Sequence, residues 1–280
     1  MVEFVSNKQH YRLNKRNAAK HYRREKTMKQ ILADYIEICL KFRKEYLSKP
    51  ERKQRHILLT EWAKAQYVDG NPTIPELYEF WDKYKDVSYN KIFIEKAIVP
   101  IVNEDFQNGG IEGLKFLFYC LHGRDGIKYI STTSPVSIFS KTHNYKYSSI
   151  QLADMVLEKE PDNEDALKAT YFIMKEHLWF SIHEIPFGVL NGMDGANISN
   201  IPNMLSSVDK FQAISNKLKI DNDEILIEDC RRFYVAYREY LQQVDRYSDF
   251  EDYLNKNNIP YERYCSTYYY EKENKQDNQQ

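Results

Sequence analysis

The chain has 280 residues and a mass of 33.5 kDa, so it is long enough to bury the hydrophobic core of one large domain or two smaller ones. Of its residues 42% are hydrophobic and 29% are charged, and the mean hydropathy is −0.69. These values exclude the collagenous, intrinsically disordered and membrane-spanning classes of protein. The net charge is −1, but residues 1–55 hold 16 Lys and Arg against 6 Asp and Glu, so that segment carries +10 and the remainder −11.

The sequence predicts a cytoplasmic protein without a membrane span. Basic residues interrupt residues 1–30, which therefore lack the apolar run of a secretory signal peptide. The longest apolar stretches, Ile92–Val102 and Ile111–Leu121, contain charged residues and fall short of the roughly 20 residues that cross a bilayer. No cysteine pair has the spacing of a zinc site, so we expect reduced thiols and neither a metal nor a cofactor. The four cysteines are Cys39, Cys120, Cys230 and Cys265.

Apolar residues recur every three or four positions in much of the first 122 residues, a pattern that predicts amphipathic helices. A stripe from Met28 to Tyr46 predicts a helix of about five turns that ends near Pro50. A shorter helix follows, and then Thr73 and Glu76 have the spacing of a capping box at the start of the next one. The stripes of these later helices are Leu58, Trp62 and Ala65; Leu77, Phe80, Trp81 and Tyr84; and Ile111, Leu114, Leu117, Phe118 and Leu121.

Helical and irregular segments alternate in the rest of the chain. Residues 124–147 mix β-branched and aromatic residues with Ser, Thr and Pro135, which predicts a long loop with one short hairpin. Helices are predicted over Ser149–Lys159 and Glu164–Ile182, and a second irregular segment with three glycines over Pro186–Pro202. A loop of that length inside a compact domain is more often functional than idle.

The last long helix is predicted to begin with Asp221 and Glu224 in capping-box register, and a brief helix follows over Asp249–Asn257. The sequence thus predicts an all-α fold, an array of antiparallel helical hairpins with a long irregular loop in mid-chain. We expect residues 1–55 to form a basic helical segment, residues 56–270 the α-helical domain, and residues 271–280 a disordered tail. The predicted buried stripe of the last long helix is Leu226, Cys230, Phe233, Tyr237, Leu241 and Val244.

One segment, residues 149–174, resembles the junction of two tetratricopeptide repeats. A small-residue stripe, a turn with an acidic residue and a proline, and a new helical stripe follow one another there, as they do in that family. The Trp, Leu, Gly and Tyr signature of the repeat and a second copy at its 34-residue period are absent from the sequence. The resemblance implies antiparallel helical hairpins stacked side by side, with a concave surface that binds peptides or other proteins. The residues that carry it are Ala153, Val156 and Leu157; Glu160, Pro161, Asp162 and Asn163; and Leu167, Thr170 and Met174.

Glu176, His177, His183 and Glu184 form the densest group of side chains with reactive potential. Spacings of seven residues place Glu176 over His183, and His177 over Glu184, on nearly the same helix face. Side chains placed in this way could form an acid–base pair or a metal site. Two turns span about 11 Å, however, and the HExxH pattern of a zinc helix is absent. We therefore favour a His and Glu pair that caps the helix end and holds the following loop.

Other catalytic and ligand-binding motifs are absent from the sequence. The segment Gly188–Asn197 has oxygen ligands but not the residue order of a calcium hand. Phosphate-loop, dinucleotide-binding and nucleophile-elbow patterns do not occur. The polar group Ser140–His143 has no partner base that the sequence can identify. The favoured interpretation is that these are polar residues of a solvent-exposed loop.

The basic segment is the candidate surface for an anionic partner. Cationic and aromatic residues are mixed there, a composition that binds phosphates and stacks on bases. No recognised nucleic-acid module accompanies it, so an acidic protein and the chain's own acidic runs, Glu158–Asp165 and Asp221–Glu224, are alternatives. The candidate binding residues are Arg12, Lys15, Arg16, Lys20, Arg23 and Arg24.

From these patterns we expect a non-catalytic protein-binding module, such as an immunity, adaptor or regulatory protein in a bacterial cytoplasm. Two alternatives stay open: nucleic-acid binding through the basic segment, and an enzyme whose site lies at His177, His183 and the 186–202 loop. Tyr accounts for 23 of the 280 residues, an abundance that suits both helix seams and partner-binding surfaces.

Overall fold

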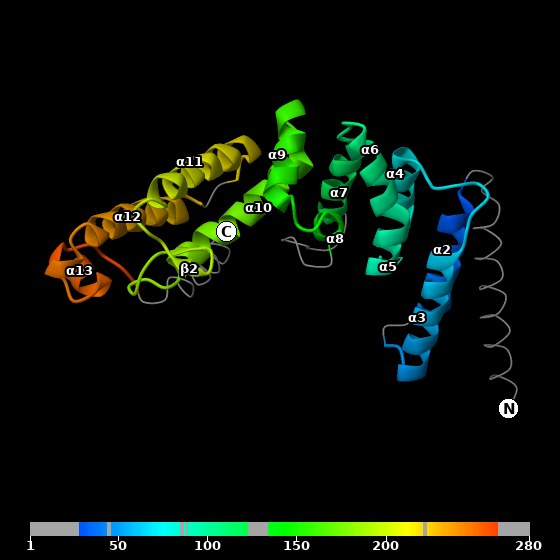
Figure 1. Cartoon of the computed structure of the whole chain (residues 1–280), viewed down its shortest axis with the longest axis horizontal. Coiled ribbons are helices and arrows are strands. Elements are labelled where there is room, and N and C mark those ends of the chain that lie inside the picture. The colour runs from blue at the N-terminus through cyan, green and yellow to red at the C-terminus, as the bar shows by residue number, and fades with distance from the viewer. Residues whose placement is uncertain are drawn as a thin grey trace, which may run out of the picture. The chain divides into compact units, whose positions relative to one another are not determined.

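The computed structural model describes residues 28–43, 46–84, 87, 89–122, 134–220 and 223–262, and these residues are mostly helical (Figure 1). The prediction of an all-α fold is therefore confirmed. The chain divides into two compact units, Met1–Pro161 (unit 1) and Asp162–Gln280 (unit 2). The boundary lies between the two helices of the segment that resembles a tetratricopeptide-repeat junction.

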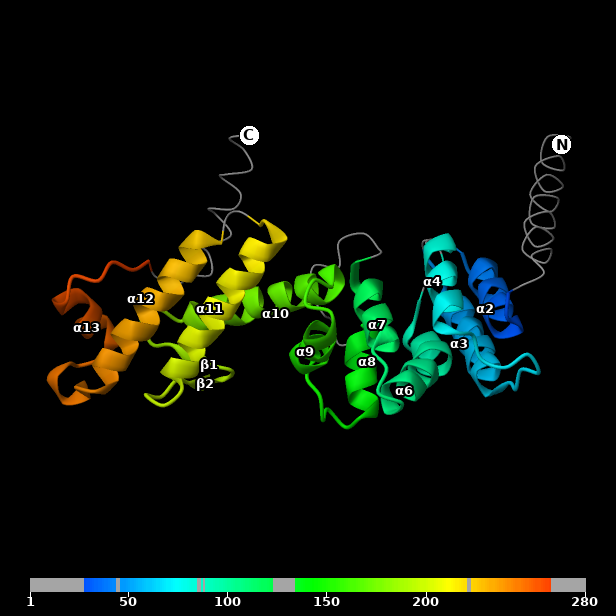
Figure 2. The same cartoon turned by 90° about the horizontal axis from the view of Figure 1, so that it is seen from above.

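In unit 1, helices that follow one another along the chain pack against each other (Figure 1, Figure 2). Packed pairs include α2 with α3, α6 with α7, α7 with α8, and α8 with α9, while α4 packs on α7. The described helices of unit 1 are α2 (Gln30–Lys41), α3 (Lys49–Lys64), α4 (Ile74–Lys83), α5 (Lys91–Phe93), the π-helical turn η1 (Ile94–Ile98), α6 (Val99–Gln107), α7 (Glu112–His122), α8 (Pro135–Thr142) and α9 (Ser149–Lys159).

The core of unit 1 is rich in aromatic side chains. Tyr35 of α2 is fully buried, with its ring centroid 5.1 Å from that of Trp62 in α3 and 4.2 Å from that of Phe93 in α5. The indole Nε1 of Trp62 donates a hydrogen bond of 2.8 Å to the carbonyl oxygen of Ile31. A buried Trp N–H needs such an acceptor, so this bond fixes α3 against α2 as well as burying the ring.

The predicted helix from Met28 to Tyr46 is too long. Helix α2 ends at Lys41, and Tyr46 lies beyond it with 83% of its surface exposed. A new helix begins instead at Lys49, because Ser48 and Glu51 form a capping box and Pro50 lies in the first turn. Proline suits the first turn of a helix, where its missing N–H is not needed, so Pro50 marks a start rather than an end. The predicted capping box of Thr73 and Glu76 is confirmed at the start of α4.

The predicted loop over residues 124–147 is wrong for its second half. Ser134 accepts a hydrogen bond from the backbone N–H of Ser137, Pro135 occupies the first turn, and α8 follows. Val136 and Phe139, which favoured a strand in the sequence, are fully buried on the inner face of this helix. Tertiary burial outweighs the weak strand preference of β-branched residues. Residues 123–133 lie outside the described part of the chain.

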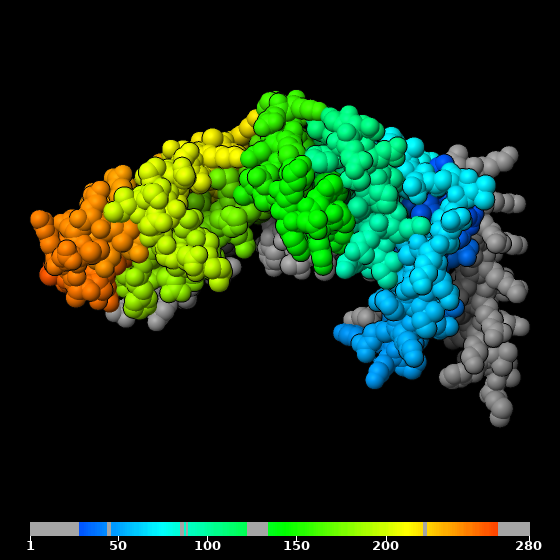
Figure 3. Space-filling model, in the orientation of Figure 1, coloured from blue at the N-terminus to red at the C-terminus, as the bar shows by residue number. Residues whose placement is uncertain are grey.

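Unit 2 is built around three helices, α10, α11 and α12, each of which packs on the other two (Figure 2). Helix α13 packs on α12, and strand β1 packs on α10. Side chains fill the spaces between neighbouring ribbons within each unit (Figure 3). The described elements of unit 2 are α10 (Glu164–Ile182), β1 (Leu190–Asn191), β2 (Asp194–Gly195), α11 (Ile201–Leu218), α12 (Glu224–Leu241), the 3₁₀ turn η2 (Val244–Arg246) and α13 (Phe250–Lys256).

Helices α9 and α10 have the bounds that the sequence predicts. The predicted capping box at the start of α12 is wrong: Asp223 is the N-cap residue, its side chain makes no cap bond, and Asp221 lies outside the described residues. Leu226, Cys230 and Phe233 are buried as predicted, but Val244 is an exposed residue of η2 because α12 has already ended.

Three predictions fall wholly or partly outside the described residues. The tail 271–280 and Cys265 lie there, and so do residues 1–27 of the basic segment. Cys39, Cys120 and Cys230 form no disulfide with one another. Among the described residues, no helix has both the length and the apolar character that crossing a membrane requires.

Candidate functional site

The sequence singled out two groups of residues, and the structure describes one of them. Arg12, Lys15, Arg16, Lys20, Arg23 and Arg24 lie outside the described residues. Glu176, His177 and His183 belong to α10 and its C-cap, and Glu184 follows directly.

Of this second group, the structure brings only His183 and Glu184 together. Glu176 and His177 are exposed on the middle of α10, whereas His183 is half-buried at the C-cap. The Nε2 atom of His183 lies 3.3 Å from Oε1 of Glu184, and Nδ1 lies 2.6 Å from the carbonyl oxygen of Phe180. Both ring nitrogens therefore have partners within the chain.

Aromatic rings also hold the His183 side chain. Its ring centroid lies 4.5 Å from that of Phe180 and 5.8 Å from that of Trp179, the latter in a stacked arrangement. A histidine that contacts a carbonyl of the last helical turn and packs against two aromatic rings stabilises the helix end. The structure thus places His183 and Glu184 side by side at the end of α10, and their role as a cap stays a prediction. No cluster of three or more His, Cys, Asp or Glu side chains suitable for a metal occurs in the described ranges.

The 186–202 loop, which begins just after this cap, is anchored to unit 2 by buried apolar residues. Ile185 and Val189 are fully buried, and the peptide bond between Ile185 and Pro186 is cis. The carbonyl oxygen of Val189 accepts a hydrogen bond of 2.8 Å from the backbone N–H of Ala196, which is also buried. Gly188 lies close to Tyr237 of α12, and an added Cβ there would be 3.5 Å from its hydroxyl oxygen.

Between these anchors the chain forms a small antiparallel hairpin. Leu190 pairs with Gly195, and Asn191 pairs with Asp194. Gly192 has a φ of +68°, the left-handed conformation that a tight two-residue hairpin turn requires at this position. Met193 therefore projects from the tip of the hairpin.

The loop closes on α11 through its own amide side chains. The Oδ1 atom of Asn197 accepts hydrogen bonds from the Ser199 hydroxyl at 2.6 Å and from the backbone N–H of Asn200 at 3.2 Å. In return, Oδ1 of Asn200 accepts a bond of 3.0 Å from the backbone N–H of Asn197. These local bonds give the loop a defined conformation although it contains almost no regular structure.

Three large apolar side chains of this anchored loop point into solvent. Phe187 is 58% exposed, Met193 is 85% exposed and Ile198 is 44% exposed. Large exposed apolar side chains on a segment of defined conformation make that segment a candidate for contact with a partner. The sequence located the loop but not these residues, because the neighbouring Val189 and Ala196 are equally apolar and are buried.

A buried carboxylate that sequence reasoning missed joins the three long helices of unit 2. Asp223 is only 3% exposed. Its Oδ1 accepts a hydrogen bond of 3.1 Å from the Tyr171 hydroxyl and lies 3.2 Å from the Lys175 Nζ, and its Oδ2 accepts one of 2.9 Å from Ser215. Burial raises the pKa of Tyr171, so the phenol keeps the proton that it donates. These contacts satisfy both carboxylate oxygens within the chain and indicate a structural role.

Carboxylates of both acidic runs form salt bridges with lysines. Asp223 of the run Asp221–Glu224 is buried in the contacts just described, so it is not available to the basic segment. In the run Glu158–Asp165, Glu160 lies 2.8 Å from Lys115 and Asp162 lies 2.8 Å from Lys217. The structure therefore gives both runs internal ion pairs that the sequence did not predict.

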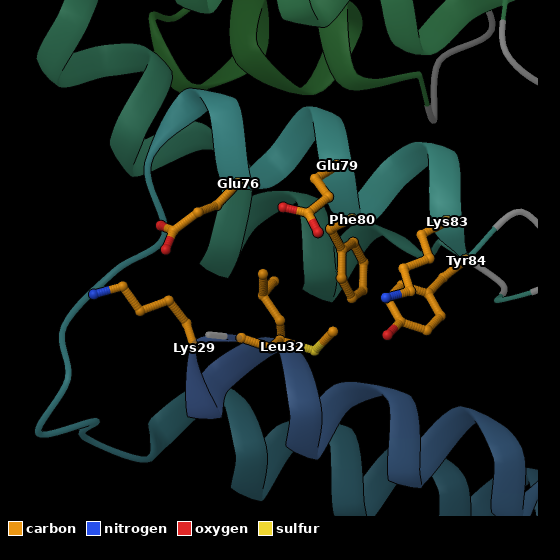
Figure 4. A pocket seen from close by; sticks show the side chains of 8 residues that line it. Lys29, Leu32, Glu76, Glu79, Phe80, Lys83 and Tyr84 are labelled. Atoms are coloured by element: carbon orange, nitrogen blue, oxygen red, sulfur yellow. The ribbon is translucent and has the colours of Figure 1, made fainter. Parts of the chain in front are cut away.

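Unit 1 has a small pocket between α2 and α4 (Figure 4). Its volume is about 90 Å³, whereas sites for small molecules and cofactors usually measure about 300–1,000 Å³. One of the carboxylates beside it, that of Glu76, accepts the backbone N–H of Thr73 at 2.7 Å in the capping box. We therefore regard the pocket as a gap in helix packing. Its lining residues are Met28, Lys29, Leu32, Glu76, Glu79, Phe80, Lys83 and Tyr84.

The candidate functional site is thus the set of exposed apolar side chains on the 186–202 loop. Comparisons of the chain with protein-family models, with curated proteins and with solved structures gave no match.

Proposed function

We propose that the protein is a non-catalytic protein-binding module and that the 186–202 loop is its recognition surface. The observation that carries the proposal is the exposure of Phe187, Met193 and Ile198 on one anchored loop. Aromatic residues and Met are enriched in protein–protein interfaces relative to the rest of the surface. A few such residues supply most of the binding energy when they enter pockets on a partner.

The anchoring of the loop supports this role. Ile185 and Val189 hold one end of the hairpin in the core, and the paired bonds of Asn197 and Asn200 hold the other. A loop that already has its bound conformation loses less conformational entropy on association than a flexible one. Its exposed side chains then contribute more of their burial free energy to affinity.

The charged residues of the loop region indicate which kind of partner surface can bind it. Between Glu184 and Pro202 the charged residues are Glu184 and Asp194, and the segment contains no Lys or Arg. Both carboxylates are exposed. A partner that fits this surface has an apolar pocket with basic residues at its rim, because charges at the edge of an interface steer association.

The helical architecture is compatible with the same role. Several pairs of consecutive helices pack on one another in both units, and we propose that they form stacked hairpins of the tetratricopeptide kind, which commonly bind proteins. An immunity, adaptor or regulatory protein of a bacterial cytoplasm would have this property. The catalytic alternative has less support, because both ring nitrogens of His183 already have partners.

The experiment is affinity capture with the full-length chain immobilised and a nuclease-treated lysate, at low and at physiological salt. A double variant, Phe187→Asp with Met193→Asp, alters the loop surface. A matched control, Val68→Asp with Tyr145→Asp, alters two exposed apolar residues of unit 1.

We expect one protein to be retained in stoichiometric amount by the wild type and the control variant and to be lost from the loop variant. Retention by all three chains alike would contradict the assignment of the loop. If the wild-type column retains no protein in stoichiometric amount, that result would contradict the binding-module proposal itself.

A further inference from the structure

Helix α3 has a cationic face. Its basic residues recur at steps of three and four, so they lie on one side of the helix and span about 22 Å along its axis. All of these side chains are exposed, and no carboxylate in the described part of the chain forms a salt bridge with any of them. The cationic face comprises Lys49, Arg52, Lys53, His56 and Lys64.

The opposite side of α3 is fixed in the core of unit 1. Leu59 and Trp62 are buried, and the Trp62 indole donates its hydrogen bond to the carbonyl oxygen of Ile31 in α2. The cationic side chains are therefore exposed to solvent, and helix α3 lies at the surface of unit 1 (Figure 3).

The position of three cations works against the stability of the helix. Lys49, Arg52 and Lys53 lie in the first two turns, where the helix dipole already places partial positive charge. Among the described residues of these two turns, Glu51 is the one carboxylate, and it accepts the backbone N–H of Ser48 at 2.9 Å in the capping box. A local arrangement that lowers stability, and that forms no salt bridge with a carboxylate in the described part of the chain, is typical of a functional site.

We propose that the cationic face of α3 binds the phosphate backbone of a nucleic acid. The face has no apolar centre, since Ile57 at its edge is the one large apolar residue among its exposed side chains. Protein interfaces are depleted of Lys at their centres, whereas nucleic-acid interfaces are strongly positive. The inference concerns another unit of the chain than the 186–202 loop and does not depend on it.

The test is fluorescence anisotropy of the full-length chain with a short labelled DNA duplex and with an RNA duplex of the same sequence, over a series of salt concentrations. The binding variant is Lys49→Gln, Arg52→Gln and Lys53→Gln together. The matched control removes the same charge elsewhere through Lys141→Gln, Lys146→Gln and Lys210→Gln, all at exposed positions. Thermal melting by circular dichroism checks that both variants fold.

We expect the α3 variant to bind at least about tenfold more weakly than the wild type at physiological salt, with a salt slope reduced by about 0.9 for each phosphate contact removed. The control should bind like the wild type, and comparison of the two duplexes shows whether DNA or RNA is preferred. Absence of binding by the wild type, or equal binding by the α3 variant, would overturn the proposal. Equally strong binding of labelled polyglutamate would also overturn it, because the surface would then recognise acidic polypeptides.

Discussion

At the scale of single residues, Gly113 shows how closely α6 and α7 approach each other. An added Cβ at Gly113 would lie 2.9 Å from the Cα atom of Val102, a backbone atom that cannot rotate away. Gly113→Ala should therefore push the two helices apart and lower the free energy of unfolding by about 1–3 kcal/mol, the usual cost of overpacking. A urea titration measures the change.

Gly195→Ala is the matched control for this prediction. Apart from its own atoms and those of its two chain neighbours, no described atom lies within 4 Å of the position that its Cβ would take. The free energy of unfolding should then change by less than about 0.5 kcal/mol, as at most surface positions. Equal effects of the two substitutions would show that contact with Val102 is not what constrains Gly113.

The Cys39 thiol illustrates an electrostatic consequence of burial. Burial raises the pKa of Cys39 to about 11, against 9.0 for an unperturbed thiol, although the neighbouring Tyr35 hydroxyl and the charge of Arg55 act in the opposite direction. Because the thiolate is the nucleophile, alkylation of Cys39 at pH 8 should be about a hundredfold slower in the folded protein than in urea. Peptide-resolved mass spectrometry of iodoacetamide-treated protein reports the rate.

The same shift determines the sign of the pH dependence of stability. The folded state holds the Cys39 proton more tightly than the unfolded state does, so this contribution is fully present below pH 9 and is lost as the pH rises toward 11. Equal alkylation rates for folded and unfolded chains would contradict the burial of this thiol.

At the scale of secondary-structure elements, capping residues decide where helices begin. The Thr73 hydroxyl accepts the backbone N–H of Glu76, and the Glu76 carboxylate accepts that of Thr73. Thr73→Ala leaves N-terminal donors of α4 without partners and should lower the free energy of unfolding by about 1 kcal/mol. Thermal or urea unfolding measures the loss.

Thr60 supplies a control of the same residue type. Its hydroxyl donates to the carbonyl oxygen of His56 inside α3, an acceptor that already has a place in the helical ladder. Thr60→Ala should be neutral or slightly stabilising because Ala has the higher helix propensity. A loss as large as that from Thr73→Ala would mean that the capping bonds of α4 contribute nothing specific.

Several helices could be predicted from the sequence. The helices that were predicted wrongly show which physical factors the apolar pattern of the sequence does not contain. The bounds of α9 and α10 follow from uninterrupted apolar periodicity between two turns with clear helix-breaking residues. Helix α2 was predicted too long because the stripe continues in register to Tyr46, and only the capping box of Ser48 and Glu51 reveals that a second helix begins. Helix α8 was missed because Val136 and Phe139 favour strands until the core buries them.

The candidate site was only partly predictable for a similar reason. Three glycines and the absence of periodicity located the 186–202 loop. Which of its apolar residues face solvent depends on contacts with α10 and α12, as the burial of Val189 and the exposure of Met193 show. Likewise, no sequence spacing relates Asp223 to Tyr171, because their contact arises from the packing of α10 beside α12.

At the scale of the whole molecule, the two compact units present different surfaces. Unit 1 has the cationic face of α3, and unit 2 has the apolar, weakly acidic surface of the 186–202 loop. A nearly neutral net charge conceals this difference, which appears only when the chain is divided. On our account, recognition of a protein partner belongs to unit 2.

The most direct test of that claim is isothermal titration calorimetry with the captured partner. It compares the dissociation constant of the Phe187→Asp, Met193→Asp variant with that of the wild type. Hot-spot residues each contribute about 2 kcal/mol or more, so the account predicts affinity at least about a hundredfold weaker for the loop variant. It predicts an unchanged constant for the Val68→Asp, Tyr145→Asp control. A loop variant that binds the partner as tightly as the wild type would contradict the assignment of the 186–202 loop as the recognition surface.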